Sequence, residues 1–565
     1  MASAHARERR RRLTYRAFPL GVIALAALGL GLSAGSAFES GSERTARAFG
    51  RAWETSDYPA MHRLLSPAAA ARYPVRALRS AYERANTTAT AAWIEAGEPE
   101  RGDGDRTLLP VRVETRVFGT IRGELRLRVD AGKVDWRPRL VFPGLADGDR
   151  LRRDSVVPER AGILSAHGQV LATGPANART SPEGGVGSSI AGAVEPSADP
   201  IEREQIYARG FPKDTPIGVS GLERALQSRL QGRPGGVLRA GERVLARASA
   251  KPAAAAQSTI DTAIQRAADT ALAERFGGIA ALDPRTAEIR ALSGVAFSAP
   301  QPPGSTFKIV TAAAALEDRL VKLSDEFPVI SETTIDGVPL ENSNGELCGG
   351  TFIEAFAHSC NSVFAPLGIK VGSRRLVAMA ERFGFNESAP VPGSAPSTLP
   401  SAGEIVSPLE VGSSAIGQGK VLATPLQIAS VAQTIASDGV RLPPTLVPTP
   451  RSRGANRVVR PATARKIERM MVAVVRYGTG TAASLPSVKV AGKTGTAELE
   501  DTRGPSDADE EAKLADPSNT DAWFTAYAPV KNPRIAVAVM LIRNGAGGET
   551  AAPAAREVLA AALNR

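Results

Sequence analysis

Apolar positions in the first half of the chain follow two kinds of spacing. Residues 44–65 and 75–92 carry apolar side chains at the intervals of an amphipathic helix. A period of two predicts strands at 108–115, 119–129 and 133–140. Together these elements predict a small α+β unit over 42–148. The stretch 173–199 is rich in Gly, Ser, Pro and Ala, has no hydrophobic period, and is predicted to be a loop or linker.

The second half, from residue 258, holds longer apolar segments. Helical spacing marks 259–275, 305–320, 425–438, 465–477 and 557–563, and short apolar runs predict strands at 278–282, 288–293, 488–496, 522–527 and 535–543. The sequence Asp283-Pro284-Arg285-Thr286 between the first two strands is typical of a hairpin turn. Because strands stand at both ends of this region, we expect an antiparallel sheet with helices packed on it.

An uncharged run of 22 residues, 17–38, interrupts the polar start of the chain. A helix of this length, at about 1.5 Å per residue, spans a bilayer core. Residues 1–16 carry six arginines and one glutamate, and this positive flank predicts a cytoplasmic N-terminus. We expect an uncleaved anchor; the alternative is a cleaved signal peptide, for which the small residues at 33–37 are suited. In both cases the remainder is expected outside the cytoplasm.

Composition and charge narrow the function classes. The chain has 565 residues, of which 43% are hydrophobic and 22% charged, as in a chain of several globular domains. Two cysteines and four scattered histidines argue against a disulfide-dense scaffold, an iron–sulfur protein and a histidine-rich metal site. The net charge of +11 suggests an anionic partner, but five of these charges lie in the first 16 residues as a topology signal. We therefore expect no nucleic-acid partner.

The sequence Ser305-Thr306-Phe307-Lys308 carries the first candidate chemistry. Two prolines and a glycine precede it, so Ser305 falls in the first turn of a predicted helix with Lys308 on the same face. A serine needs a base to act as a nucleophile, and a desolvated lysine supplies one, whereas arginine does not deprotonate. Taken alone, the pattern also fits an ordinary helix start.

Two further motifs change this interpretation. Ser359-Cys360-Asn361 follows 54 residues after Ser305, and Lys493-Thr494-Gly495-Thr496 lies in a later strand-like run. The trio Ser-x-x-Lys, Ser-x-Asn and Lys-Thr-Gly is the signature of penicillin-binding proteins and related β-lactamases. The chain has 12 lysines against 57 arginines, and two of those 12 occupy the positions where the motifs require lysine.

On these motifs the chain resembles the class B penicillin-binding proteins, the monofunctional D,D-transpeptidases of bacterial cell-wall synthesis. Blocks similar to the family occur along nearly the whole chain: Gly221-Leu222-Glu223, Leu230-Gln231-Gly232, Ser258-Thr259-Ile260-Asp261 with Gln265, Ala281-Leu282-Asp283-Pro284, Ile416-Gly417-Gln418-Gly419, Thr424-Pro425-Leu426-Gln427, Gly478-Thr479-Gly480-Thr481 and Ala522-Trp523-Phe524. Residues 42–148, with Asp135-Trp136 and Phe142-Pro143, are similar to the NTF2-like N-terminal domain of the methicillin-resistance type.

The resemblance implies an α+β multidomain chain with a single N-terminal transmembrane helix. Its transpeptidase domain would hold an antiparallel sheet flanked by helices, as in serine β-lactamases. The implied parts are a basic cytoplasmic tail 1–16, the anchor 17–38, the NTF2-like domain 42–148, a pedestal or dimerisation region 149–256 with a flexible insert 173–199, and the transpeptidase domain 257–565.

The resemblance also implies catalytic roles. Ser305 would be the acylated nucleophile and Lys308 its general base. Ser359 would pass a proton toward the leaving D-alanine, and Asn361 would hold Lys308 and the substrate amide. Lys493 would tune the electrostatics, because a second ammonium nearby helps to lower the pKa of Lys308.

The third motif would bind the substrate. Thr494 and Thr496 would hold the terminal carboxylate of the stem peptide, and Gly495 would let the substrate backbone lie close to an edge strand. The backbone N–H groups of Ser305 and Thr496 would form the oxyanion hole. The implied reaction is attack on D-Ala-D-Ala followed by aminolysis by a second stem peptide, and β-lactams would inhibit it covalently.

The implied partners are peptidoglycan stem peptides, β-lactams, the membrane and a separate glycosyltransferase, since 40–255 shows no glycosyltransferase signature. No cofactor and no metal is implied. The implied localisation is the bacterial cell membrane, with a single pass, a cytoplasmic N-terminus and an extracytoplasmic catalytic domain. Two rival functions stay open: a serine β-lactamase, for which we find no Glu-x-x-Leu-Asn pattern between the second and third motifs, and a non-catalytic β-lactam sensor or scaffold.

Some features depart from the family pattern. The chain between the hairpin and Ser305 is short, at 294–304, and Arg160-Ala161-Gly162 lacks the usual Arg-Gly opening. Residues 498–511 hold seven acids and are expected to be a solvated surface loop; the alternative is a mobile flap.

The two cysteines, Cys348 and Cys360, lie 12 residues apart. Outside the cytoplasm such thiols tend to oxidise. We expect a disulfide that braces the loop holding Ser359 and Asn361; the alternative is two buried free thiols. His358, which is adjacent, is expected to be a packed helix residue rather than a catalyst.

Overall fold

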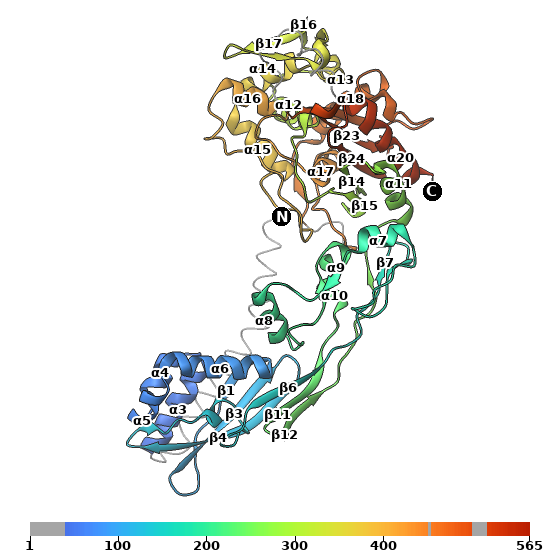
Figure 1. Cartoon of the computed structure of the whole chain (residues 1–565). Helices are drawn as coiled ribbons and strands as arrows, with labels where there is room; N and C mark the ends of the chain where they lie inside the picture. The colour runs from blue at the N-terminus through green and yellow to red at the C-terminus, as the bar shows by residue number, and fades with distance from the viewer. Residues whose placement is uncertain (1–39, 450–453, 500–516, 565) are drawn as a thin grey trace, which may run out of the picture. The chain divides into compact units, whose positions relative to one another are not determined.

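The computed structural model describes residues 40–449, 454–499 and 517–564. The predicted anchor at 17–38 and most of the acidic stretch 498–511 lie outside the described residues. No described helix combines the length and the apolar character needed to cross a membrane. The chain divides into two compact units (Figure 1). The first takes up 40–156, Glu204–Pro212 and Pro234–Ser249, and the second takes up the rest.

The first unit packs helices against an antiparallel sheet of order β1-β3-β4-β5, with β2 paired to β3. Its elements are α3 (Gly41–Glu54), α4 (Tyr58–Arg63), α5 (Pro67–Arg72), α6 (Val75–Ala89), β1 (Ala91–Ala96), β2 (Glu100–Arg101), β3 (Arg106–Thr115), β4 (Gly119–Asp130), β5 (Lys133–Val134) and η2 (Pro138–Val141). A second sheet, β12-β11-β6, joins β6 (Leu151–Val156), β11 (Gly235–Ala240) and β12 (Arg243–Ala248). Aromatic residues fill the core, where the Trp136 indole donates to the Tyr82 hydroxyl at 3.0 Å.

Local backbone chemistry overrides three predicted elements of this unit. The predicted helix 44–65 is two helices, because Ser56 has a φ of 55° and Asp57 then caps α4. The predicted helix 75–92 ends at Ala89, and Thr90, with a φ of 56°, starts the unpredicted strand β1. The predicted strand 133–140 shrinks to β5, because Pro138 has no N–H to pair and opens a 3-10 turn.

The second unit begins with short elements around a buried carboxylate. They are β7 (Ile163–Leu164), β8 (Val170–Ala172), α7 (Gly185–Ala191), β9 (Val194–Glu195), α8 (Pro200–Ala208), β10 (Ile217–Gly218), α9 (Gly221–Ala225), α10 (Gln227–Leu230) and β13 (Ala256–Gln257), with α8 continuing into the first unit. The predicted loop 173–199 is thus partly structured. Its small residues fold as α7 because Ile190 and Ala191 pack into the core of the unit.

Glu223 holds these elements together. Its carboxylate accepts from the Nε atoms of Arg160 and Arg179, each at 2.7 Å, and all three side chains are buried or nearly so. Arg160 belongs to the opening that departs from the family pattern, and it nevertheless forms the central ion pair of this region.

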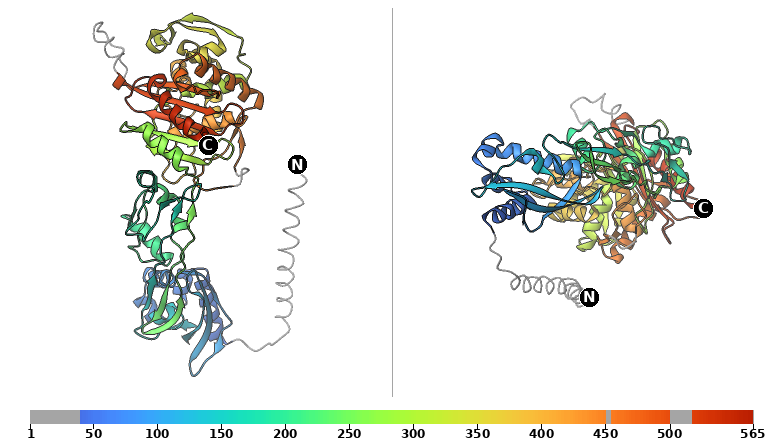
Figure 2. Two further views of the ribbon diagram at one scale, coloured as in Figure 1. Left: turned by 90° about the vertical axis from the view of Figure 1, so that its right-hand side faces the viewer. Right: turned by 90° about the horizontal axis from the view of Figure 1, so that it is seen from below.

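The rest of the second unit is built on a five-stranded antiparallel sheet of order β15-β14-β24-β23-β22, as the sequence predicts. The strands are β14 (Gly277–Leu282), β15 (Ile289–Gly294), β22 (Ala491–Glu498), β23 (Thr520–Ala528) and β24 (Ile535–Leu541). Segments far apart in the sequence lie side by side here, as the green and red strands of Figure 2 show. One face packs against α11 (Thr262–Leu272) and α20 (Ala552–Leu563), and the other packs against α17 (Pro425–Ala436).

The remaining helices form a second lobe over that other face. They are η3 (Gly304–Phe307), α12 (Lys308–Glu317), α13 (Phe352–Ala357), α14 (Asn361–Val371), α15 (Ser373–Phe383), α16 (Pro408–Ala415) and α18 (Pro461–Arg476). The sequence pattern did not predict two small two-stranded sheets. One pairs β16 (Glu326–Ile330) with β19 (Cys348–Thr351), and the other is the hairpin of β17 (Glu332–Ile335) and β18 (Val338–Glu341).

The buried carboxylate gives a stability prediction. Replacing Glu223 with Ala leaves two guanidinium groups without their anion, so we expect the free energy of unfolding to fall by about 3 kcal/mol. Urea unfolding of the purified chain measures this change. Glu195→Ala removes an exposed carboxylate from the same region and should change the value by less than about 0.5 kcal/mol. Equal effects of the two substitutions would contradict the role assigned to Glu223.

Candidate active site

The first and third motifs meet where the start of η3 packs against the edge strand β22. A Cβ on Gly495 would lie 2.7 Å from the carbonyl oxygen of Pro303, so only glycine allows this approach. Gly304, with a φ of 50°, sits equally close, because a Cβ there would lie 2.5 Å from the carbonyl oxygen of Thr496. The two glycines therefore place Ser305 directly beside the Lys-Thr-Gly strand.

Lys308 is fully buried at the start of α12. Its Nζ donates to the backbone oxygen of Ser359 at 2.6 Å and to Oδ1 of Asn361 at 2.7 Å, and it lies 3.3 Å from the Ser359 hydroxyl. Burial holds the pKa of Lys308 well below its ordinary value, and the charge of Lys493 lowers this pKa further. Within the described part of the chain, no carboxylate forms an ion pair with Lys308.

These contacts suit a neutral amine. A neutral amine has two N–H donors and one lone pair, and the two short bonds to Ser359 and Asn361 use both donors. The lone pair is then left to the third contact, the Ser359 hydroxyl at 3.3 Å, which can donate a proton as well as accept one. Ser305 is half-buried while Lys308 is enclosed, so a reactant reaches the hydroxyl and water does not reach the amine.

Lys493 is also fully buried, and burial lowers its pKa to about 7. Its Nζ donates to the backbone oxygen of Thr494 at 3.2 Å and lies 5.5 Å from the centre of the Phe356 ring. The Nζ of Lys308 likewise lies 5.5 Å from the centre of the Phe364 ring. An aromatic face thus lies near each lysine nitrogen as a weak, uncharged partner in place of a carboxylate.

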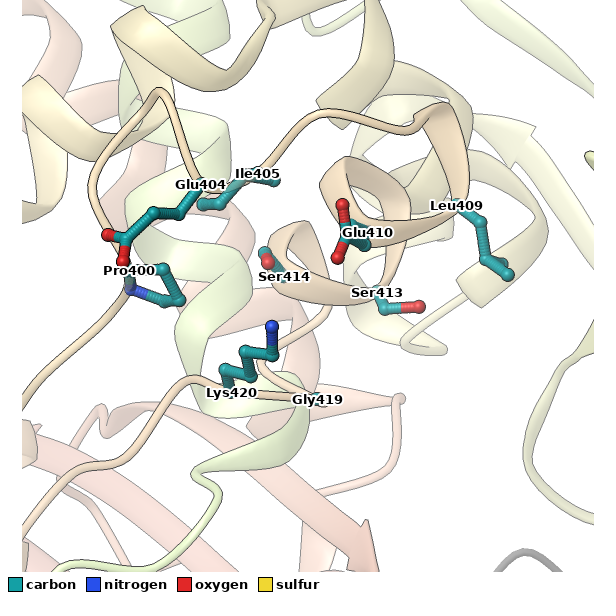
Figure 3. A pocket seen from close by; sticks show the side chains of 9 residues that line it. All are labelled: Pro400, Glu404, Ile405, Leu409, Glu410, Ser413, Ser414, Gly419 and Lys420. Atoms are coloured by element: carbon teal, nitrogen blue, oxygen red, sulfur yellow. The ribbon is translucent and has the colours of Figure 1, made fainter.

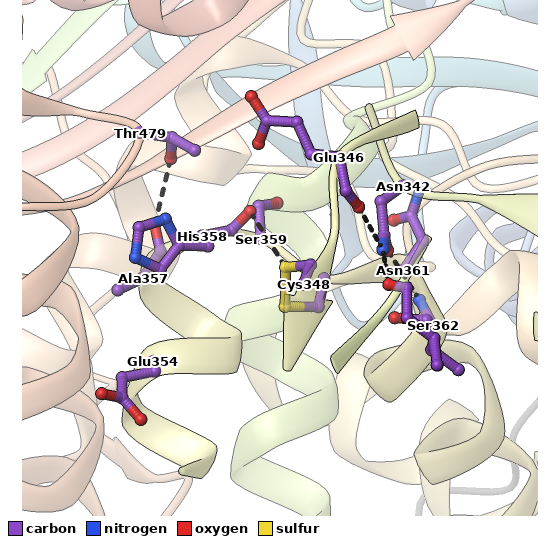
Figure 4. The surroundings of a disulfide bond; sticks show 12 residues. Asn342, Glu346, Cys348, Glu354, Ala357, His358, Ser359, Asn361, Ser362 and Thr479 are labelled. Carbon is purple, nitrogen blue, oxygen red and sulfur yellow. Dashed lines mark hydrogen bonds between the residues drawn. A yellow bond between two sulfur atoms is a disulfide. The ribbon is translucent and has the colours of Figure 1, made fainter. Parts of the chain in front are cut away.

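The second motif is held in a strained turn between α13 and α14. Ser359 has a φ of 63°, a conformation that a non-glycine residue adopts only when its surroundings impose it. Cys348 and Cys360 form a disulfide, with their Cα atoms 5.4 Å apart, which ties this turn to β19. Figure 4 shows the disulfide between the segment of Ser359 and the side chain of Asn361.

The β17–β18 hairpin fixes the orientation of Asn361. The Asn361 Nδ2 donates to the backbone oxygen of Glu341 at 2.7 Å, which leaves Oδ1 to face Lys308. The next residue, Asn342, accepts from the backbone N–H of Ser362 at 3.0 Å. This hairpin is therefore a structural support of the second motif.

His358 is not the packed helix residue that the sequence predicts. It caps the C-terminal end of α13, where the chain turns away, and its side chain is exposed. Its ring centre lies 6.3 Å from that of Tyr477, and the ring takes no part in the contacts of Lys308.

Two residues at the site were not assigned a role from the sequence. Thr479 shares a 2.6 Å hydrogen bond between its hydroxyl and that of Thr494, and its backbone N–H donates to Ala357 at 3.1 Å. The backbone N–H of Gly547 donates to the Thr496 hydroxyl at 3.4 Å. The Gly-Thr-Gly-Thr block pointed to Thr479, whereas nothing in the local pattern singled out Gly547.

No group of three or more His, Cys, Asp or Glu side chains is placed to hold a metal ion in the described ranges. The site thus consists of a half-buried serine, a buried lysine without a counter-ion, and an edge strand carrying Lys-Thr-Gly. This fold and this set of groups define the class of penicillin-recognising serine proteins.

The chain belongs to the penicillin-binding protein transpeptidase family, since the family model described as penicillin binding protein transpeptidase domain matches residues 277–560. It is 36% identical over 298 residues to a peptidoglycan D,D-transpeptidase PbpA of Mycolicibacterium smegmatis, a match that covers 47% of this chain and 56% of the relative. The PbpA of Mycobacterium tuberculosis is also 36% identical, over 300 residues. The chain thus spans a little over half the length of these relatives.

The chain is also similar to solved structures of penicillin-binding proteins. Penicillin-binding protein A from M. tuberculosis, as a ceftriaxone acyl-enzyme, is 26% identical with a TM-score of 0.55, and the match covers 72% of this chain and 98% of that one. PBP2 of Pseudomonas aeruginosa, in complex with WCK 5153, is 25% identical with a TM-score of 0.61, and the match covers 73% and 96%.

The two buried lysines give a pH prediction. Because only the neutral amine of Lys308 accepts a proton, the rate of β-lactam acylation should rise with pH through the lowered pKa of Lys308. Lys493→Met removes the second positive charge, which raises that pKa, so the rising limb should move by roughly one unit to higher pH. Acylation rates measured by stopped flow across pH test this. Lys489→Met, which replaces an exposed lysine, is the control and should leave the pH dependence of the acylation rate unchanged. If the pH dependence were also unchanged in Lys493→Met, the electrostatic effect of Lys493 on Lys308 would be contradicted.

Proposed function

We propose that the chain is a peptidoglycan D,D-transpeptidase that cross-links stem peptides through an acyl-enzyme on Ser305. The observation that carries this proposal is the full burial of Lys308, three residues after Ser305, among the uncharged acceptors of Ser359 and Asn361. The named activity of the M. smegmatis relative and the acyl-enzyme of the M. tuberculosis relative support it.

In the first step, Ser305 Oγ attacks the carbonyl carbon of the penultimate D-alanine, and Lys308 Nζ takes the hydroxyl proton. The negative charge that develops on the carbonyl oxygen is stabilised by the backbone N–H groups of Ser305 and Thr496. Collapse of the adduct breaks the peptide bond, and the terminal D-alanine leaves as its nitrogen receives a proton. Ser359 is the group that delivers it, since its hydroxyl lies 3.3 Å from Lys308.

In the second step, the amine of another stem peptide attacks the ester of Ser305. The proton path then runs in reverse: the amine loses a proton toward Lys308, and Ser305 Oγ recovers one as the new peptide bond forms. Asn361 keeps Lys308 in place through both steps.

The edge strand β22 is the substrate-binding element of the proposal. An extended peptide added along this edge would pair with the backbone at Gly495, where no side chain obstructs it. The hydroxyls of Thr494 and Thr496 would then hold the terminal carboxylate. Their orientation is set by Thr479 and Gly547.

The alternative function is that of a serine β-lactamase, and the contacts of Lys308 argue against it. Fast deacylation needs a base that activates water on the acyl-enzyme, and the hydrogen bonds of Lys308 among the described residues go to Ser359 and Asn361 only. With no carboxylate engaged there, a β-lactam adduct should persist.

The wider setting of the enzyme follows from the sequence. We infer a basic cytoplasmic tail 1–16, a single transmembrane anchor at 17–38, an NTF2-like domain over 42–148 and a pedestal region over 149–256. The catalytic part would then work outside the cytoplasmic membrane, next to a separate glycosyltransferase that supplies glycan strands.

Fluorescent penicillin tests this function. We expect stable labelling of the whole chain, loss of labelling in Ser305→Ala, and unchanged labelling in Ser298→Ala, which replaces an exposed serine nearby. Mass spectrometry of the labelled peptide should place the adduct on Ser305. Rapid turnover of the label would favour a β-lactamase, and no labelling would favour a scaffold; either result would overturn the proposal.

A further inference from the structure

A cavity of about 210 Å³ lies on the second unit beside α16, away from the Lys308 contacts. A water molecule takes up about 30 Å³ of the liquid, so the cavity has room for a small organic molecule. Its apolar part includes Ile405 and Leu409. Its polar groups are the carboxylates of Glu404 and Glu410, the hydroxyl of Ser414 and the ammonium of Lys420 (Figure 3).

The charged groups of this cavity are only partly engaged. Glu404 uses Oε2 to accept from the backbone N–H of Ser401 at 2.9 Å, and Glu410 uses Oε2 to accept from that of Ser407 at 3.2 Å. The Oε1 atom of each carboxylate has no hydrogen-bond partner in the part of the chain that the structure describes. Lys420 is exposed and forms neither a hydrogen bond nor an ion pair there, but its charge acts on both carboxylates and helps to lower the pKa of each.

Ser414 supplies an independent indication of a ligand. Its side chain is only 5% exposed, and what remains accessible faces the cavity. Its hydroxyl makes no hydrogen bond among the described residues. Figure 3 shows this hydroxyl and the Lys420 ammonium turned toward the space between the two glutamates. Because this hydroxyl opens on the cavity, a bound polar group would replace solvent as its hydrogen-bond partner.

The charges of the cavity are complementary to a molecule that carries both signs. The Ser401 side chain holds the pKa of Glu404 below its ordinary value, and the backbone N–H of Ser407 does so for Glu410. Both carboxylates are therefore ionised at neutral pH, beside one lysine ammonium. A lone anion would be repelled by the two glutamates, and a lone cation would be repelled by Lys420.

We propose that this cavity binds the zwitterionic head group of an amino acid. The ligand ammonium would lie between Glu404 and Glu410, its carboxylate would meet Lys420 and Ser414, and its carbon atoms would pack on Ile405 and Leu409. Two sources present this chemistry: free D-alanine, and a stem-peptide side chain that ends in a zwitterion. Binding itself is independent of the proposed reaction, and only the choice of these sources rests on it.

The helix α16, which lines the cavity, and the loop after it are hydrogen-bonded to the segment that holds Ser305. The Thr311 hydroxyl of α12 donates to the backbone oxygen of Ala415, the last residue of α16, at 2.6 Å. The backbone N–H of Gly304 donates to the backbone oxygen of Gly417 at 3.0 Å. A ligand held by Ser414 and Lys420 would therefore contact the segment that supports the nucleophile from behind.

Calorimetric titration of the whole chain carrying Ser305→Ala tests the site without any acylation. We expect D-alanine to bind with a Kd of about 1 mM. D-alaninamide lacks the carboxylate and N-acetyl-D-alanine lacks the ammonium, so both should bind at least about tenfold more weakly. A stem peptide with a zwitterionic side chain, titrated in parallel, distinguishes the two sources, because the true ligand binds more tightly.

Substitutions assign the binding to this cavity. Lys420→Met should weaken zwitterion binding about tenfold, and Lys466→Met, an exposed lysine on α18, should not change it. The proposal would be overturned if neither zwitterion bound saturably at concentrations up to about ten times 1 mM. Equal binding of the neutralised analogues, or unchanged binding in Lys420→Met, would also overturn it. Penicillin labelling of the unmodified chain is measured separately, so failure here leaves the proposed function standing.

Discussion

Burial of Lys308 among neutral acceptors is the constraint on which the rest of the site depends. A buried ammonium without a carboxylate is costly, so the enclosure of this side chain favours the free amine. The acceptors that replace a carboxylate are the Ser359 backbone oxygen and the Asn361 amide oxygen. Both must be held rigidly, and the strained φ of Ser359, the disulfide and the β17–β18 hairpin provide this rigidity. The need to hold Lys308 among uncharged acceptors thus explains why several elements that are distant in sequence meet at this site.

The central sheet and the three motifs were predictable from the sequence, because each depends on local signals. Short apolar runs predicted all five strands, and the motif spacing marked Ser305, Lys308 and Lys493 as a group. The parts that were missed depend on contacts with distant residues. The helix α7 forms in a small-residue stretch because Ile190 and Ala191 reach the core. Thr90 ends its helix in a left-handed turn that no hydrophobic period records.

The residues that hold the second motif in place were also not predictable from the sequence pattern. Glu341 and Asn342 hold the motif through backbone and amide groups, and their side-chain pattern resembles that of an ordinary surface hairpin. Gly547 contributes only a backbone N–H to Thr496, which leaves no mark beyond a glycine in a glycine-rich loop. The positions of the lysines, by contrast, pointed to functional residues, because the chain uses arginine at most of its basic positions. Lys308 and Lys493 need a group that can lose its proton, and Lys420 faces the cavity beside α16.

The protonation state of Lys308 is the central claim, and it can be measured directly. With 12 lysines in the chain, NMR of protein labelled at the lysine Cε and Nζ atoms gives a tractable spectrum, and Lys308→Met assigns the signal. The account predicts that the Lys308 amine of the uninhibited enzyme titrates far below the ordinary lysine value of 10.5. A Lys308 signal that stays in the charged form through neutral pH and titrates near 10.5 would contradict it.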